Sequence, residues 1–212
     1  MKQAYFLLGL NGAGKSSLRD LENFDKITII DADKIQRETN CSEIEAGKKA
    51  IHLFRECIKN NKSFLLESTL TGNLILKQIE TAKQYNYNVN CVYVGLNSLS
   101  DHIDRVAIRV QNGGHNIPIE TIERRYLISY GNIKKLFNLS SSLAIYDNTQ
   151  NYAKQFELTN NEMKRIQTPQ KWIVDHVILP YTHSSFKEYR NRIEEKQSNG
   201  PISKIVQSKL SK

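Results

Sequence analysis

Cysteine is scarce in this chain of 212 residues: Cys41, Cys57 and Cys91 lie far apart and without C-x-x-C spacing. Such an odd, scattered set excludes a disulfide framework and a zinc site, so we expect free thiols. No apolar run comes near the roughly 20 residues that cross a bilayer. The run Tyr5–Leu8 is also too short for a signal sequence. We therefore expect a cytoplasmic protein without a membrane partner.

Internal repeats and low-complexity blocks are also missing, as is the L-S-G-G-Q-like signature of ABC-transporter motors. The apolar fraction of 39% and the charged fraction of 25% are typical of a soluble globular protein. The formal net charge of +8 would suit nucleic acid, an acidic protein or a polyanionic small substrate. Much of the excess falls near the C-terminus, where no aromatic residues alternate with the basic ones. This pattern favours a solvated tail over a nucleic-acid site.

Strand and helix patterns alternate along the first 150 residues. The expected strands cover 3–8, 26–30, 63–67, 89–94 and 143–146, and the expected helices cover 15–21, 43–60, 73–85, 99–110 and 118–137. Repeated units of this length predict an α/β fold with a mostly parallel sheet covered on both faces. We assign 1–150 to this domain. The remainder, 151–212, reads as a small basic extension with a helix at about 172–179 and a final dozen residues without fixed structure.

Residues 9–16 read G-L-N-G-A-G-K-S, which fits the Walker A pattern G-x-x-x-x-G-K-[ST] between a strand and a helix. Glycines let the backbone turn with positive φ, so that N–H groups can surround phosphate oxygens. Lys15 is expected to reach the β- and γ-phosphates and Ser16 to hold Mg²⁺. The motif therefore predicts a P-loop NTPase three-layer sandwich that binds ATP or GTP. The predicted nucleotide-binding residues are Gly9, Asn11, Gly12, Ala13, Gly14, Lys15, Ser16 and Ser17.

Acidic residues follow two of the expected strands, and ligands of open α/β sheets bind outside the carboxyl ends of strands. Asp33 could accept a proton from a substrate hydroxyl, or it could cap the helix that follows. Asp31 could bind Mg²⁺ or cap that helix. Glu67 could orient Mg²⁺ or substrate, or it could be a solvated carboxylate at the end of its strand.

Arginines are the candidates for stabilising the charge that develops on a migrating phosphoryl group. Arg109 precedes the segment 112–118, N-G-G-H-N-I-P, which is typical of a mobile lid, and Arg124 and Arg125 follow it. We take these three arginines as catalytic candidates; the alternative for each is an exposed ion pair. His115 is a candidate substrate contact, although a lone histidine in a glycine turn is more often structural.

Six segments together resemble the zeta toxin-like P-loop kinases, in particular the short bacterial branch labelled predicted ABC-type ATPase. The stretch G-G-H-x-[IV]-P followed by R-R-Y is much more specific to that branch than the Walker A pattern is. The resemblance extends over roughly residues 4 to 150. Its segments are 8–16, 30–33, 64–70, 109–118, 124–126 and 145–148.

The resemblance implies a fold related to shikimate and adenylate kinases and the phosphorylation of a small substrate by ATP or GTP. In characterised zeta toxins that substrate is a UDP-activated amino sugar, phosphorylated on a hydroxyl. By motif, Lys15 would be the phosphate lysine, Asp33 the general base, and Glu67 and Thr69 substrate contacts. An antitoxin protein becomes a candidate partner.

The second catalytic arginine of that family cannot be placed uniquely, because the spacing after Arg109 is shorter here; Arg124 and Arg125 both qualify. The sequence thus predicts a small-molecule kinase. The alternatives are a nucleic-acid end kinase, which the charge of +8 suggests, and a regulatory ATPase.

Overall fold

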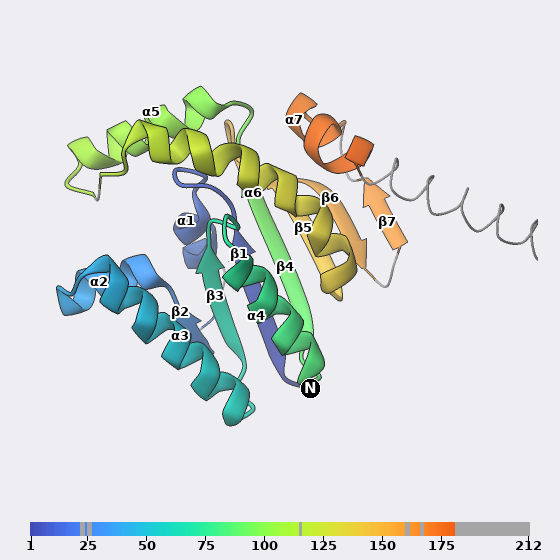
Figure 1. The fold of residues 1–212 in the computed structure, drawn as a ribbon. Helices are drawn as coiled ribbons and strands as arrows, with labels where there is room; N and C mark the ends of the chain where they lie inside the picture. The colour runs from blue at the N-terminus through green and yellow to red at the C-terminus, as the bar shows by residue number, and fades with distance from the viewer. Residues whose placement is uncertain (22–23, 25–26, 115, 160–161, 166–167, 181–212) are drawn as a thin grey trace, which may run out of the picture.

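The structure, a computed structural model, describes residues 1–21, 24, 27–114, 116–159, 162–165 and 168–180. Within these residues one seven-stranded sheet has the order β2-β3-β1-β4-β5-β6-β7 (Figure 1). The first five strands in chain order run parallel to one another. Strand β6 is antiparallel to β5, and β7 is antiparallel to β6. The sheet is therefore mostly parallel, which confirms the prediction. The strands are β1 (Gln3–Leu8), β2 (Thr28–Ile30), β3 (Phe64–Ser68), β4 (Asn88–Gly95), β5 (Ser142–Asp147), β6 (Ala153–Thr159) and β7 (Glu162–Arg165).

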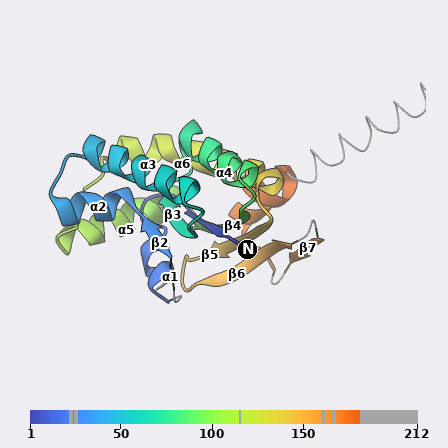
Figure 2. The ribbon, with the colours of Figure 1, turned by 90° about the horizontal axis from the view of Figure 1, so that it is seen from below.

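Helices cover both faces of the sheet, so that the domain has three layers. In Figure 2, α3, α4 and α6 lie on one face of the sheet and α1 lies on the other. In the described part of the chain, no helix combines the length and the apolar character needed to span a membrane. The helices are α1 (Lys15–Leu21), α2 (Ala32–Thr39), α3 (Glu43–Lys59), α4 (Asn73–Gln84), α5 (Leu99–Gln111), α6 (Ile119–Leu139), α7 (Lys171–Ile173) and the π-helical turn η1 (Val174–Ile178).

The core explains why β1 lies at the centre of the sheet. Phe6 and Leu8 are buried in the large cluster that includes residues of α3, α4 and α6. Leu7 points to the opposite face, where it packs with Ala13 and Leu18. Burial on both faces is typical of a central parallel strand. The loop that leaves β1 therefore starts in the middle of the carboxyl edge of the sheet.

The segment after residue 150 differs from our prediction of a helical extension. Residues 153–165 contain β6 and β7, and β6 pairs antiparallel with β5 with Phe156 opposite Ile145. Phe156 and Leu158 are buried in the large core cluster, which favours an added strand over a helix. The helix predicted near Trp172 corresponds to α7 and η1. The domain boundary at residue 150 remains a prediction, although the sheet continues across it, and the basic tail lies outside the described residues.

Candidate active site

The loop between β1 and α1 has the backbone that the Walker A pattern requires. Gly9, Gly12 and Gly14 have φ values of 144°, 79° and 92°, in the region that favours glycine. At Gly14 a side chain would also be blocked, since its Cβ would lie 2.4 Å from Asn148 Nδ2 and 2.6 Å from Tyr152 Oη. These two glycine requirements, conformation and close approach, make the loop a candidate phosphate site.

Side chains from elsewhere in the chain hold the carbonyl groups of this loop. Asn148 Nδ2 donates to Ala13 O at 2.9 Å and Tyr152 Oη donates to Gly14 O at 2.6 Å. His102 Nδ1, on α5, lies 2.8 Å from Asn11 O. Three loop carbonyl oxygens are thus held by side chains that lie outside the loop.

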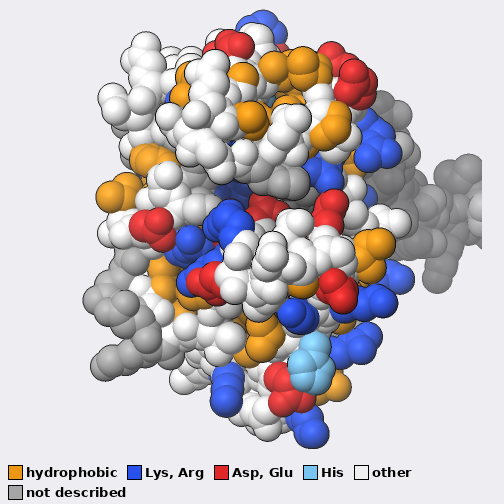
Figure 3. Space-filling view, turned by 90° about the vertical axis from the view of Figure 1, so that its left-hand side faces the viewer, with side chains coloured by type: hydrophobic (Ala, Val, Ile, Leu, Met, Phe, Trp, Pro, Cys, Tyr) orange, Lys and Arg blue, Asp and Glu red, His pale blue; other side chains and the backbone are white. Residues whose placement is uncertain are grey.

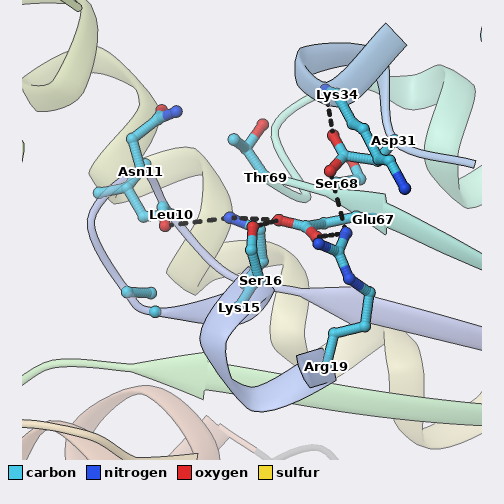
Figure 4. Close-up of polar contacts among 12 residues, drawn as sticks. Leu10, Asn11, Lys15, Ser16, Arg19, Asp31, Lys34, Glu67, Ser68 and Thr69 are labelled. Carbon is cyan, nitrogen blue, oxygen red and sulfur yellow. Dashed lines mark hydrogen bonds and ion pairs between the residues drawn. The ribbon is translucent and has the colours of Figure 1, made fainter. Parts of the chain in front are cut away.

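Beside the loop, the carboxylate of Glu67 at the end of β3 is in contact with three groups of α1 (Figure 4). Ser16 Oγ donates to Glu67 Oε1 at 3.0 Å, and Lys15 Nζ lies 3.9 Å from the same oxygen. Arg19 Nη1 lies 3.1 Å from Glu67 Oε2 and 3.0 Å from Asp31 Oδ2. Two strand-end carboxylates thus converge on one guanidinium at the edge of the phosphate loop.

The neighbours of Glu67 have opposing effects on the pKa of its carboxyl group. Burial raises the pKa of Glu67 above its usual range, and the negative charge of Asp31 acts in the same direction. Lys15, the hydroxyl of Ser16 and Arg19 lower it. The carboxylate consequently depends on these cations to stay ionised.

Asp31 and Asp33 have different surroundings although they are only two residues apart. Asp31 is the N-cap of α2, and its Oδ1 accepts from Lys34 N at 3.2 Å. Asp33 lies in the first turn of α2, is exposed, and lines a cleft of about 570 Å³. The helix-cap alternative that the sequence left open for Asp33 thus belongs to Asp31.

The cleft brings together most of the predicted catalytic and substrate-binding residues. In Figure 3 basic and acidic side chains gather around the hollow in the middle of this face. Arg124 is exposed on its wall, and Arg125 Nη1 donates to Asn11 Oδ1 of the phosphate loop at 3.1 Å. The predicted residues among its lining are Asn11, Lys15, Asp33, Glu67, Thr69, Arg124 and Arg125.

Among the described residues, the predicted site residues Arg109 and Ser17 do not line this cleft, and neither do Gly9, Gly12, Ala13, Gly14 and Ser16 of the phosphate loop. Arg109 lies on α5, where its carbonyl oxygen accepts from Gly114 N at 2.8 Å, and it is not one of the described lining residues. Ser17 is exposed on α1 and likewise does not line the cleft. His115 lies outside the described residues. The roles proposed for these residues from the sequence remain predictions.

Sequence reasoning missed several residues that hold the site together. Arg19 is four residues after Lys15 and therefore on the same side of α1, a spacing that could have pointed to it. Asn148 belongs to a segment of the family resemblance, but neither it nor Tyr152 had an assigned role. His102 carried no signal, because its contact with Asn11 joins residues 91 positions apart.

His102 leads to a prediction about pH. Burial lowers its pKa from 6.5 to about 4, so the unfolded chain binds more protons in this interval. The free energy of unfolding should therefore fall as the pH drops from 6.5 towards 4, by roughly 3 kcal/mol in total for this group. Urea unfolding at several pH values measures the slope. His102→Asn, which keeps a donor near Asn11 O, should flatten that slope; an unchanged slope would contradict the assignment.

Comparison with known proteins identifies one relative in sequence. It is an uncharacterized protein of Haemophilus influenzae, 38% identical over 129 residues, which make up 58% of this chain and 92% of the relative. The chain belongs to the same family as this protein. No protein-family model matches the chain.

Solved structures resemble the chain in fold. A chain of the AvrRxo1-ORF1:-ORF2 complex with ATP has a TM-score of 0.60 at 12% identity, over 78% of this chain and 61% of that one. The chain thus spans about three fifths of the AvrRxo1 chain. A chain of the PezAT toxin–antitoxin system of Streptococcus pneumoniae has a TM-score of 0.52 at 19% identity, over 82% and 75%. At these identities the likeness shows the fold, and the fold is P-loop kinase-like.

Proposed function

We propose that this protein is a kinase that transfers the γ-phosphate of ATP or GTP to a hydroxyl of a small molecule. One observation carries the proposal: an exposed carboxylate that no helix cap requires, Asp33, lines the same cleft as Lys15 of the phosphate loop. In kinases a carboxylate beside the phosphate loop accepts the proton of the acceptor hydroxyl, and the cleft beside Lys15 provides both such a carboxylate and room for the acceptor.

The oxygen atoms next to the phosphate loop fit Mg²⁺ that arrives with a nucleotide. Ser16 Oγ and the Glu67 carboxylate, 3.0 Å apart, are hard donors of the kind Mg²⁺ prefers. Among the described residues no group of three His, Cys, Asp or Glu side chains could hold a metal ion alone. Mg²⁺ usually keeps several waters and binds through one or two protein groups plus phosphates. When bound, it would neutralise charge on the transferring phosphoryl group.

Each protein group has a definite task in the proposed reaction. Lys15, whose Nζ lies near Leu10 O and the Glu67 carboxylate, would turn to the β- and γ-phosphates. Asp33 would accept the proton of the attacking hydroxyl as that oxygen bonds to phosphorus. Arg124 and Arg125 would offset the negative charge of the transition state from the cleft wall.

The chemistry of the cleft favours an acceptor rich in hydroxyl groups. Beyond the phosphate loop its lining offers carboxylates, amides and hydroxyls, namely Asp33, Gln36, Glu43, Thr69, Asn116 and Thr121. Such groups bind the hydroxyls of a sugar with paired hydrogen bonds. This lining and the family resemblance support a UDP-activated amino sugar as the acceptor that we propose.

A protein partner is a further part of the proposal. PezAT, which shares the fold, is a toxin–antitoxin system. We propose that an antitoxin protein restrains this chain. Expression of the chain alone should then slow bacterial growth, and expression of Asp33→Asn should not.

Incubation of the purified protein with γ-labelled ATP and a bacterial metabolite extract tests the activity. We expect the label on a small hydroxyl compound, identified by mass. Label on added oligonucleotides would favour the nucleic-acid end kinase instead, and label released only as inorganic phosphate would favour a regulatory ATPase.

A further inference from the structure

We propose that Arg19 is a positioning residue that holds Glu67 in place for the magnesium–nucleotide complex, acting from behind the cleft. The inference rests on the proposed kinase function. Arg19 is not among the described residues that line the cleft, yet both carboxylates that its guanidinium contacts, Asp31 and Glu67, do line it. Its direct contacts with the cleft are therefore made through those two carboxylates.

Arg19 contacts both carboxylates through one nitrogen of its guanidinium group. A single nitrogen, Arg19 Nη1, lies 3.0 Å from Asp31 Oδ2 and 3.1 Å from Glu67 Oε2, as Figure 4 shows. The three side chains are 13%, 5% and 10% exposed. Charged hydrogen bonds in such buried surroundings are stronger than neutral ones and fix direction as well as distance. The second Glu67 oxygen, Oε1, is thereby left towards Ser16 and Lys15.

The charges explain why the guanidinium is needed there. Asp31 and Glu67 carry two negative charges, and the positive charges of Lys15 and Arg19 lie beside them. When Lys15 turns to the phosphates, Arg19 alone remains beside the two carboxylates. Asp31, Glu67 and Arg19 together then have one net negative charge beside Mg²⁺. The positive charge of Arg19 reduces the repulsion between the two carboxylates and so keeps them in position.

Arg19 differs from the surface arginines in that its side chain is largely buried. Its Nε is 3.2 Å from Asp20, a residue 69% exposed, and that contact contributes little. The contacts with Asp31 and Glu67 join α1 to the ends of β2 and β3, in addition to the contacts of Ser16 and Lys15 with Glu67. Arg19 thus fixes the spatial relation between the phosphate loop and two strand ends.

The test measures binding of Mn²⁺, a paramagnetic substitute for Mg²⁺, by electron paramagnetic resonance with and without ATP. Arg19→Met keeps the apolar stem and removes the charge. We expect Mn²⁺ affinity in the presence of ATP to fall about tenfold or more, while metal-free ATP affinity stays within about threefold. Arg19→Lys should fold normally and recover part of the Mn²⁺ affinity, since one ammonium can replace one of the two contacts. Arg55→Met, on the exposed side of α3, is the control and should change neither quantity.

A double-mutant cycle shows whether Arg19 acts through Glu67. If it does, adding Glu67→Gln to Arg19→Met should reduce Mn²⁺ affinity by less than about threefold beyond the single variant. Full additivity, an Arg19→Met protein with wild-type Mn²⁺ affinity, or an Arg19→Lys protein without any recovery would each overturn the inference. A wild-type protein that binds neither ATP nor Mn²⁺ with ATP would instead refute the kinase function on which it rests.

Discussion

Asp33→Asn is expected to slow phosphate transfer about 10³-fold, within the usual range for a lost general base. The amide keeps the shape of the side chain but cannot accept the proton of the attacking hydroxyl. Affinity for ATP should stay within about threefold, because Asp33 lies on α2 and no phosphate-loop residue is altered. Single-turnover kinetics with the acceptor, together with calorimetric titration of ATP, measure the two quantities separately.

The matched control for this variant is Glu38→Gln on the same helix. Glu38 is 62% exposed, pairs with Lys34 at 3.7 Å and does not line the cleft, so its removal should leave transfer unchanged. Both variants keep Asp31, so α2 keeps its N-cap hydrogen bond. An Asp33→Asn protein that retains more than about a tenth of wild-type transfer would rule out the general-base role.

The sheet was predictable from sequence wherever a strand is buried on both faces. Such strands appear as short apolar runs, as in the segment Gln3–Leu8, and the helices between them have clear helical periodicity. Helix α2 was not predicted as a separate element because it is short and none of its eight residues is buried, which leaves no apolar pattern to read. Strand β6 was missed because the run around Phe156 is short and lies beyond the repeating units.

The site was predictable only where one local motif contains the chemistry. Lys15 and Ser16 follow from the Walker A pattern, and Asp33 and Glu67 follow from the rule that ligands bind at strand ends. His102 and Tyr152 act through contacts between residues 91 and 138 positions apart in sequence, which no pattern of spacing reveals, and the partners of Arg19 likewise become visible only in the fold. Arg109 illustrates the converse case, since its place before the lid segment suggested a role in the cleft, whose described lining does not include it.

Lys15→Met should reduce transfer by about 10³-fold and, unlike Asp33→Asn, should also weaken ATP binding by roughly 10- to 100-fold. The side chain of Lys15 is 10% exposed and is the one basic side chain of residues 9–16, so no other residue of the loop can replace its positive charge. Thermal unfolding measures the binding loss directly, because a ligand at a hundred times its Kd stabilises by about 2.7 kcal/mol. For a chain of this length that corresponds to a rise in Tm of about 5–10 °C. Binding weakened 10- to 100-fold leaves only about 0.4–1.4 kcal/mol at the same ATP concentration, so the variant should show about half of that rise or less.

Lys34→Met provides the control, because Lys34 is on α2 with its side chain 44% exposed and pairs only at the surface with Glu38. It should keep both the ATP-dependent rise in Tm and the transfer activity. Without nucleotide, Lys15→Met should melt close to the wild-type temperature, since the contacts of Ser16 and Arg19 with Glu67 remain. An equal rise in Tm with ATP for Lys15→Met and the wild type would mean that the glycine turn does not bind the triphosphate, and the kinase function would then have no basis in this site.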